Sequence, residues 1–110
     1  MTVIDVNSSK NIKKKLPEEQ HLQVNLEAAA EIAAQLRLRN LSGIIIIDFI
    51  DMASAEHKEC LLSAMQSFVK TDPVKTEVVD LTRLGLMELT RKKTRRPLRE
   101  QLGMFDTDEQ

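Results

Sequence analysis

The stretch that decides the fold is GIIIIDFIDM, residues 43–52, in which a run of four isoleucines is followed by two aspartates. The run from Ile44 to Ile50 is β-branched, too short for a helix and preceded by turn-forming residues, so it predicts a strand. Because both of its faces are apolar, we expect a central strand that is covered on both sides, as parallel strands are. Asp48 then poses a question, because a carboxylate buried among aliphatic side chains is costly unless it is paired or neutralised.

Segments on either side of this run indicate further strands and helices. A short strand is expected at residues 2–6, and a polar loop at 8–20. Asn25 is expected to be the N-cap of a helix that runs to about Arg39, because apolar residues then recur at three- and four-residue spacing. Ser54 is expected to cap a second helix with a core-facing stripe formed by Leu61, Leu62, Met65, Phe68 and Val69.

A third strand is expected at residues 76–81, followed by a fourth strand or an irregular return near Leu84 to Leu89. The strand–helix–strand–helix–strand order predicts an α/β fold, a single domain with a mostly parallel sheet flanked by helices. We expect this domain to occupy residues 1–96 and to be followed by a polar tail at 97–110.

The composition bounds the class of protein. With 42% hydrophobic residues, 30% charged residues and a net charge of −1, the 110-residue chain is typical of a globular domain and not of a disordered one. Aromatic residues make up only 3%, so platforms for stacking unpaired bases are nearly absent. The single cysteine, Cys60, excludes an internal disulfide and is expected to be a buried or half-buried thiol. No signal peptide or membrane span is expected, and a reducing cytoplasm fits best.

Polar side chains follow two of the predicted strands where each strand ends. Asp48 ends one strand, and Asp5 and Asn7 end the first. Open α/β sheets bind ligands at the carboxyl edge, so these oxygens predict a site for Mg²⁺ or Mn²⁺. The alternative is that aspartates here only end strands and cap helices, and Asp51 in particular is expected to be a local turn residue.

Cationic and titratable residues allow two interpretations each. Arg37 could bind phosphate, or it could satisfy carbonyls at a helix end. Arg91 and Lys92 open a run with five positive charges in six positions, which would contact RNA phosphates or form a solvated tail. His21 and His57 lack a partner at metal-ligand spacing and are expected at the surface.

Three segments resemble the ribonuclease E/G family. They are IDVN at residues 4–7, NLEAAAEIAAQLRLRNLSGIIIIDFIDM at 25–52 and KTEVVDLTRLGLMELTRKKTR at 75–95. The resemblance covers nearly the whole chain to Arg96 and points to the deoxyribonuclease I-like catalytic subdomain. It implies Mg²⁺-dependent endonucleolytic cleavage of single-stranded RNA, with Asp5 and Asp48 as metal ligands and Asn7 orienting water or the scissile phosphate.

The chain also departs from the family. The family's oligonucleotide-binding barrel, 5′-phosphate sensor and ribonuclease H-like part have no counterpart here, and its C-P-x-C zinc motif does not follow residue 96. We therefore expect no zinc site, no small-molecule cofactor, weak activity of the chain alone, and missing family domains supplied in cis or in trans. The alternative is a non-catalytic RNA- or metal-binding module, or a fragment that self-associates through exposed apolar surface.

Overall fold

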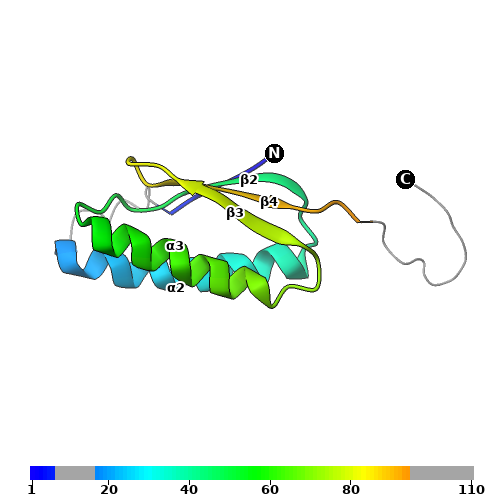
Figure 1. The fold of residues 1–110 in the computed structure, drawn as a ribbon, viewed down its shortest axis with the longest axis horizontal. Coiled ribbons are helices and arrows are strands. Elements are labelled where there is room, and N and C mark those ends of the chain that lie inside the picture. The colour runs from blue at the N-terminus through cyan, green and yellow to red at the C-terminus, as the bar shows by residue number, and fades with distance from the viewer. Residues whose placement is uncertain (7–16, 95–110) are drawn as a thin grey trace, which may run out of the picture.

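The computed structural model describes residues 1–6 and 17–94, which form a sheet and two helices (Figure 1). In chain order the elements are β1 (Thr2–Asp5), α2 (Glu18–Leu38), β2 (Gly43–Asp48), α3 (Ala55–Lys70), β3 (Thr76–Leu81) and β4 (Leu86–Arg91). The α/β class and the expected order of elements are confirmed. The predicted tail at 97–110 and the candidate catalytic residue Asn7 lie outside the described residues.

The sheet is mixed, with the strand order β1-β2-β4-β3. β1 pairs with β2 in parallel, whereas β4 pairs antiparallel with both β2 and β3. β1, β2 and β3 run in one direction, but β4 lies reversed between β2 and β3. Only the β1–β2 pair is therefore parallel, and the expectation of a mostly parallel sheet is wrong. The segment near Leu84 to Leu89 thus contains a strand, β4. It lies beside β2, where β3 would lie in a fully parallel sheet.

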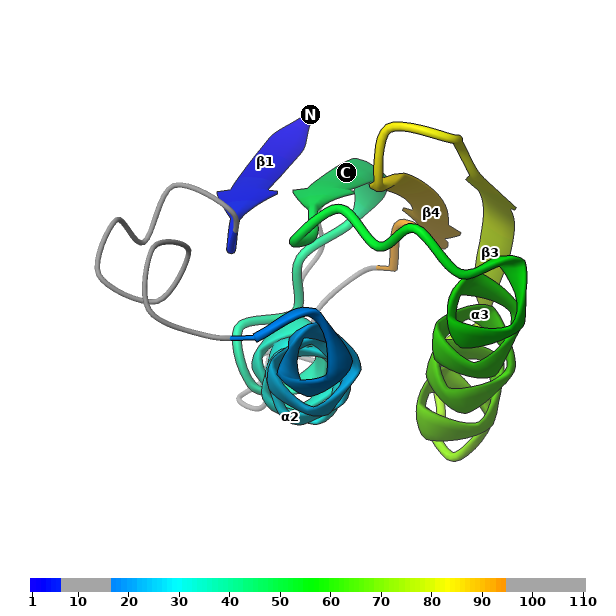
Figure 2. The same ribbon diagram turned by 90° about the vertical axis from the view of Figure 1, so that its left-hand side faces the viewer.

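Both helices cover the same face of the sheet (Figures 1 and 2). Ile45 and Ile47 point into this layer and are 0% exposed, whereas Ile44 on the opposite face is 45% exposed. The expectation that the isoleucine strand is covered on both faces is therefore wrong for the described residues. Because both helices pack on one side, apolar side chains of the outer face stay exposed to water, and Val3 is 64% exposed.

The core lies between the sheet and the helices. Its fully buried members include Ala29 and Leu36 of α2, Leu61 and Met65 of α3, and, from the sheet and its exits, Ile45, Ile47, Phe49, Met87 and Leu89. Burying one such large aliphatic or aromatic side chain stabilises the fold by about 1.5–3 kcal/mol. This layer fixes which face of β2 points outward.

Helix α2 begins earlier than the sequence suggested. Pro17 takes the N-cap position, and Glu18 and Glu19 lie in the first turn, where their charges suit the helix dipole. Asn25 is therefore inside the helix and is not its N-cap. At the other end, Asn40 adopts a left-handed conformation with φ 51°, and Leu41 N–H donates to the Leu36 carbonyl at 3.0 Å, closing the helix.

Helix α3 starts as expected. The Ser54 hydroxyl accepts a 3.2 Å hydrogen bond from His57 N–H, and Leu61, Met65 and Val69 are buried. Cys60 is exposed, because it lies beside this stripe and not in it, so the expected burial of its thiol is wrong. Neither described helix is long and apolar enough to span a bilayer.

Candidate active site

The two candidate metal ligands lie side by side at one edge of the sheet. Asp5 and Asp48 are the last residues of β1 and β2, and they are register partners in the parallel pair. Neighbouring strands lie about 4.7–4.9 Å apart, and aligned residues of a parallel pair project to the same face. The expectation that parallel pairing brings these two carboxylates to a common edge is confirmed.

The acidic pair, Asp5 and Asp48, lies on the outer face of the sheet. Alternation along β2 places Asp48 on the side of Ile44, opposite the buried Ile45 and Ile47. Asp5 is exposed and Asp48 is half-buried, so neither carboxylate sits among the core aliphatics. The question that the isoleucine run raised is answered by this geometry: the inner face anchors the strand, and the outer face presents the acid.

Two adjacent carboxylates suit a hard divalent cation. Mg²⁺ is usually held in proteins by one or two carboxylates and keeps several waters, so two protein ligands are enough. Within residues 1–6 and 17–94, no group of three or more His, Cys, Asp or Glu residues is arranged to hold a metal ion. The acidic pair offers only carboxylate oxygens, whereas nitrogen and sulfur ligands are the ones that favour zinc.

The chain that leaves β2 after Asp48 is held from three sides. The Asp48 carbonyl accepts from Val6 N–H at 3.0 Å, and Phe49 N–H donates to the Gly85 carbonyl at 3.0 Å. Asn25 of α2 then makes two hydrogen bonds to Ile50, donating to its carbonyl at 2.8 Å and accepting from its N–H at 3.0 Å. The residue after β1, the β3–β4 turn and helix α2 thus meet at the end of this strand.

Gly85 lies against the backbone directly after β2. It has φ +89°, and a Cβ at this position would lie 3.0 Å from the Phe49 carbonyl oxygen. Both the conformation and the contact require glycine. The turn between β3 and β4 can therefore approach the backbone directly after Asp48.

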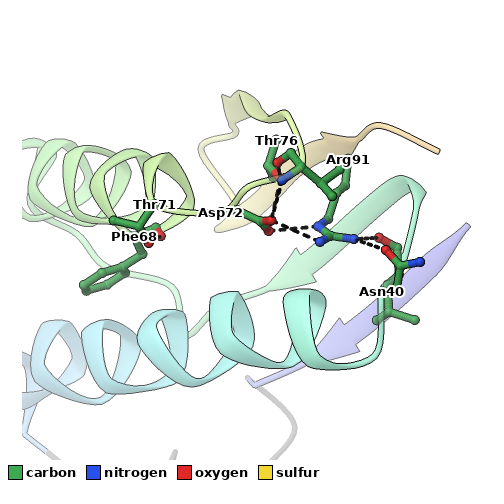
Figure 3. A network of polar contacts seen from close by, with 8 residues as sticks. Asn40, Phe68, Thr71, Asp72, Thr76 and Arg91 are labelled. Atoms are coloured by element: carbon green, nitrogen blue, oxygen red, sulfur yellow. Dashed lines mark hydrogen bonds and ion pairs between the residues drawn. The ribbon is translucent and has the colours of Figure 1, made fainter. Parts of the chain in front are cut away.

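Arg91, one of the candidate RNA contacts, is buried at the opposite end of the sheet (Figure 3). Its guanidinium forms a two-pronged ion pair with Asp72, with Nε to Oδ2 at 2.9 Å and Nη2 to Oδ1 at 3.0 Å. Nη1 donates to Asn40 Oδ1 and to the Leu41 carbonyl, both at 2.9 Å. Because the side chain is 2% exposed and its donors are engaged inside the protein, the expectation that Arg91 binds RNA is corrected to a structural role.

Asp72 completes this buried network. Its carboxylate also accepts from Val74 N–H at 2.9 Å, and its side chain is 2% exposed. The hydrogen bonds from Arg91 hold the pKa of Asp72 below its ordinary value, although burial acts in the opposite direction. The pair ties the chain after α3 to β4 and, through Asn40, to the end of α2.

The other two candidate RNA contacts are exposed, but they are not near the acidic pair. Lys92 directly follows β4, and Arg37 lies in the last turn of α2, where its charge acts on Asp72. Gly43 pairs with Arg91 and Asp48 with Leu86, so these two ends of β2 lie about 16 Å apart. The structure therefore separates the acids from the candidate cations along the strands.

The histidines differ from expectation as well. His21 has a side chain that is only 14% exposed, with Nδ1 3.6 Å from Glu18 Oε1, and His57 is half-buried.

Asn25 is the residue at this site that sequence reasoning misread. A polar residue four positions before Ala29 and in line with the apolar stripe of α2 was the available signal, because such a residue needs a buried partner.

The chain is similar in sequence to known proteins of one family. The Ribonuclease E/G family matches residues 1–94 of the chain. Ribonuclease G of Haemophilus influenzae is 46% identical over 98 residues, 89% of this chain and 20% of that protein. Ribonuclease G of Escherichia coli K12 is 44% identical over 95 residues, 86% of this chain and 19% of that protein.

Ribonuclease E of Synechocystis is similar too, with 47% identity over 103 residues, 94% of this chain and 15% of that protein. The chain thus spans about a fifth, or less, of the length of these relatives. The matched segment of the chain contains both members of the acidic pair and both helices. By the extent of this match, the chain belongs to the ribonuclease E/G family.

Proposed function

We propose that this chain carries the catalytic centre of an endoribonuclease that cleaves single-stranded RNA, with Asp5 and Asp48 as ligands of Mg²⁺ or Mn²⁺. The observation that carries the proposal is the register of β1 and β2, which pairs the two aspartates at the edge where both strands end. The relatives are named as ribonucleases, and RNA is the substrate that this name implies. The reaction would take place in the cytoplasm.

The chain's own residues would hold and orient the reacting groups. When bound, the cation would supply Lewis-acid chemistry, activating water and neutralising charge on the phosphodiester. Asp5 and Asp48 provide two hard oxygen donors on strands fixed by the core beneath them. Asn7, two residues after Asp5 in the sequence, would orient the attacking water or the scissile phosphate.

RNA binding away from the acidic pair would depend on exposed cations. Arg37 and Lys92 are both exposed, and Lys92 lines the same surface pocket as Lys75. Contacts of this kind give phosphate affinity without sequence preference, and the affinity falls as salt rises. Replacing both Arg37 and Lys92 by alanine would make the slope of log K against log [salt] for binding of single-stranded RNA less steep by about 1.4, at about 0.7 for each lost contact.

The chain alone would cleave slowly. Its aromatic content of 3% offers little base stacking, and positioning of the substrate is a large part of the rate of such a reaction. The parts of the longer relatives that this chain does not span would supply that positioning, in cis or in trans.

Cleavage and cation binding together test the proposal. The chain is incubated with a single-stranded, A/U-rich RNA and Mg²⁺, and Asp48→Asn and Asp5→Asn are compared with Asp80→Asn. Asp80 is an exposed acid of β3 and makes a control with the same charge change. We expect both site variants to lose cleavage and the control to retain it.

A binding measurement covers the case in which cleavage is too slow to follow. Cation at a hundred times its dissociation constant should stabilise the parent by about 2.7 kcal/mol, seen as a higher melting temperature. The two site variants should lose this shift. A parent whose melting temperature does not respond to Mg²⁺ or Mn²⁺ contradicts the proposed metal site.

The outer face of the sheet favours a second function, self-association. Apolar side chains on it are substantially exposed: Val3 at 64%, Val79 at 54%, Ile44 at 45% and Leu86 at 37%. Exposed apolar side chains gathered on one face mark contact surfaces in soluble proteins. Sedimentation of the parent and of Ile44→Lys tests it: concentration-dependent association that the variant abolishes supports a homo-oligomer, and a monomer at all concentrations excludes it.

A further inference from the structure

Asn25 is a fully buried polar residue in the apolar stripe of α2, at 0% exposure. Its side-chain amide engages one residue twice: Nδ2 donates to the Ile50 carbonyl at 2.8 Å, and Oδ1 accepts from Ile50 N–H at 3.0 Å. The amide thereby takes the place of a neighbouring strand for this one residue, since it offers the same donor and acceptor that a peptide group would.

The residue that Asn25 holds lies two positions after Asp48. Ile50 is 3% exposed and lies past the end of β2, where the chain turns from the sheet toward α3. A buried backbone N–H or carbonyl without a partner destabilises the fold. Asn25 supplies both partners, so the chain can leave the sheet directly after the acid.

Packing alone does not require asparagine at this position. The neighbouring members of the α2 stripe, Ala29 and Ile32, are apolar, and an aliphatic residue of similar volume would fill the same space. What an aliphatic residue cannot do is bond to the backbone of Ile50. The specific contribution of Asn25 is therefore to the path of the chain after β2.

We propose that Asn25 is a positioning residue for the acidic pair: by fixing Ile50 it sets the direction in which the Asp48 carboxylate projects, and hence the affinity of the pair for a divalent cation. This inference rests on the proposed function, because it assumes that Asp5 and Asp48 bind the cation. Asn25 itself does not contact the cation. It acts through two peptide units, and the bonds of Phe49 to Gly85 and of Asp48 to Val6 support the same segment.

The first test is the affinity of Asn25→Leu for Mn²⁺, measured by electron paramagnetic resonance of the free ion in titrations of the full chain. Outer contacts that orient a metal ligand are worth about 10–100-fold in metal affinity. We expect a loss within this range. The matched control is Leu36→Ala, a buried change near the other end of α2 that lowers stability but leaves the exit of β2 untouched.

The two proposals fail differently in this test. Equal Mn²⁺ affinity of the folded Asn25→Leu and the parent overturns the positioning role and leaves the metal site standing. A parent that binds no Mn²⁺ overturns the metal site, and the positioning role with it. If Leu36→Ala loses affinity to the same extent, the effect is one of general stability and the positioning role is refuted.

A second measurement on the parent applies even if Asn25→Leu does not fold. Coupling between two sites is reciprocal. A cation that binds more tightly when the segment after β2 is held in place must therefore also stabilise that segment. Saturating Mg²⁺ should slow hydrogen exchange of the Ile50 amide more than that of the Asn40 amide, which bonds to the Arg37 carbonyl at the end of α2 far from the acidic pair. Equal slowing of the two amides refutes the coupling.

Discussion

Removal of the carboxylate of Asp72 should destabilise the fold severely, although this residue lies far from the acidic pair. The side chains of Asp72 and Arg91 are each 2% exposed, and the ion pair is two-pronged at 2.9 and 3.0 Å. In Asp72→Ala the guanidinium of Arg91 stays buried without a counter-charge, which typically costs about 3–5 kcal/mol. For a domain of this size, we expect the melting temperature to fall by at least about 12 °C.

The exposed ion pair beside it provides a matched control. Lys75 and Glu77 lie 3.3 Å apart on the same end of the sheet, with side chains 72% and 61% exposed. Because water screens this pair, Glu77→Ala should cost no more than about 1 kcal/mol. Urea unfolding of both variants at pH 7, with unchanged slope against denaturant, gives the two free energies of unfolding.

A double variant separates the charge from the packing. Asp72→Ala combined with Arg91→Met removes both charges, and most of the loss should be recovered, because the expensive state is one buried charge without the other. If Asp72→Ala costs as little as Glu77→Ala, the pair is not buried in solution. If the double variant is as unstable as the sum of the two single variants, the charges do not act on each other.

Three further outcomes follow from individual contacts. Arg91 lowers the pKa of Asp72 in the folded protein. The stability that the carboxylate adds is therefore fully present above the ordinary pKa of aspartate, about 3.9, and is lost as the pH falls through the lower pKa of the folded state. Parent and Asp72→Ala should thus converge in melting temperature as the pH falls below about 4. Gly85→Ala should lower the free energy of unfolding by about 1–3 kcal/mol, because φ is +89° and the new Cβ would lie 3.0 Å from the Phe49 carbonyl oxygen. The folded protein should also bind Mn²⁺ more weakly than the parent in an electron paramagnetic resonance titration. Ser54→Ala removes the hydroxyl that caps α3 and should lower the free energy of unfolding in urea by about 1 kcal/mol; no change would mean that the 3.2 Å bond to His57 N–H adds nothing.

The features that the sequence predicted well are those set by short-range patterns. The third strand, Thr76–Leu81, has the expected bounds, and Ser54 caps α3 as its spacing from the apolar stripe implied. The meeting of Asp5 and Asp48 was predictable because parallel pairing aligns strand ends, and each aspartate closes an apolar run. These inferences needed only local periodicity and one topological rule.

The features that the sequence did not predict depend on partners far along the chain. Arg91 appeared to be part of a basic surface run, but Asp72 and Asn40, which bury it, are 19 and 51 positions away. Asn25 appeared to be a helix cap because its true partner, the backbone of Ile50, is 25 positions away. Hydrophobic periodicity assigns a residue to a face, and it does not say which strand will lie beside it or which helix will cover it.

The two strands that carry the acidic pair differ in how they are held. β2 has a strand on each side, whereas β1 has four residues and, among the described strands, a neighbour on one side only. Fraying of β1 would carry Asp5 away while the remaining three strands stay folded. The measured cation affinity is then the intrinsic affinity multiplied by the docked fraction of β1, so a partner that pairs with the free edge of β1 would tighten cation binding without touching either carboxylate.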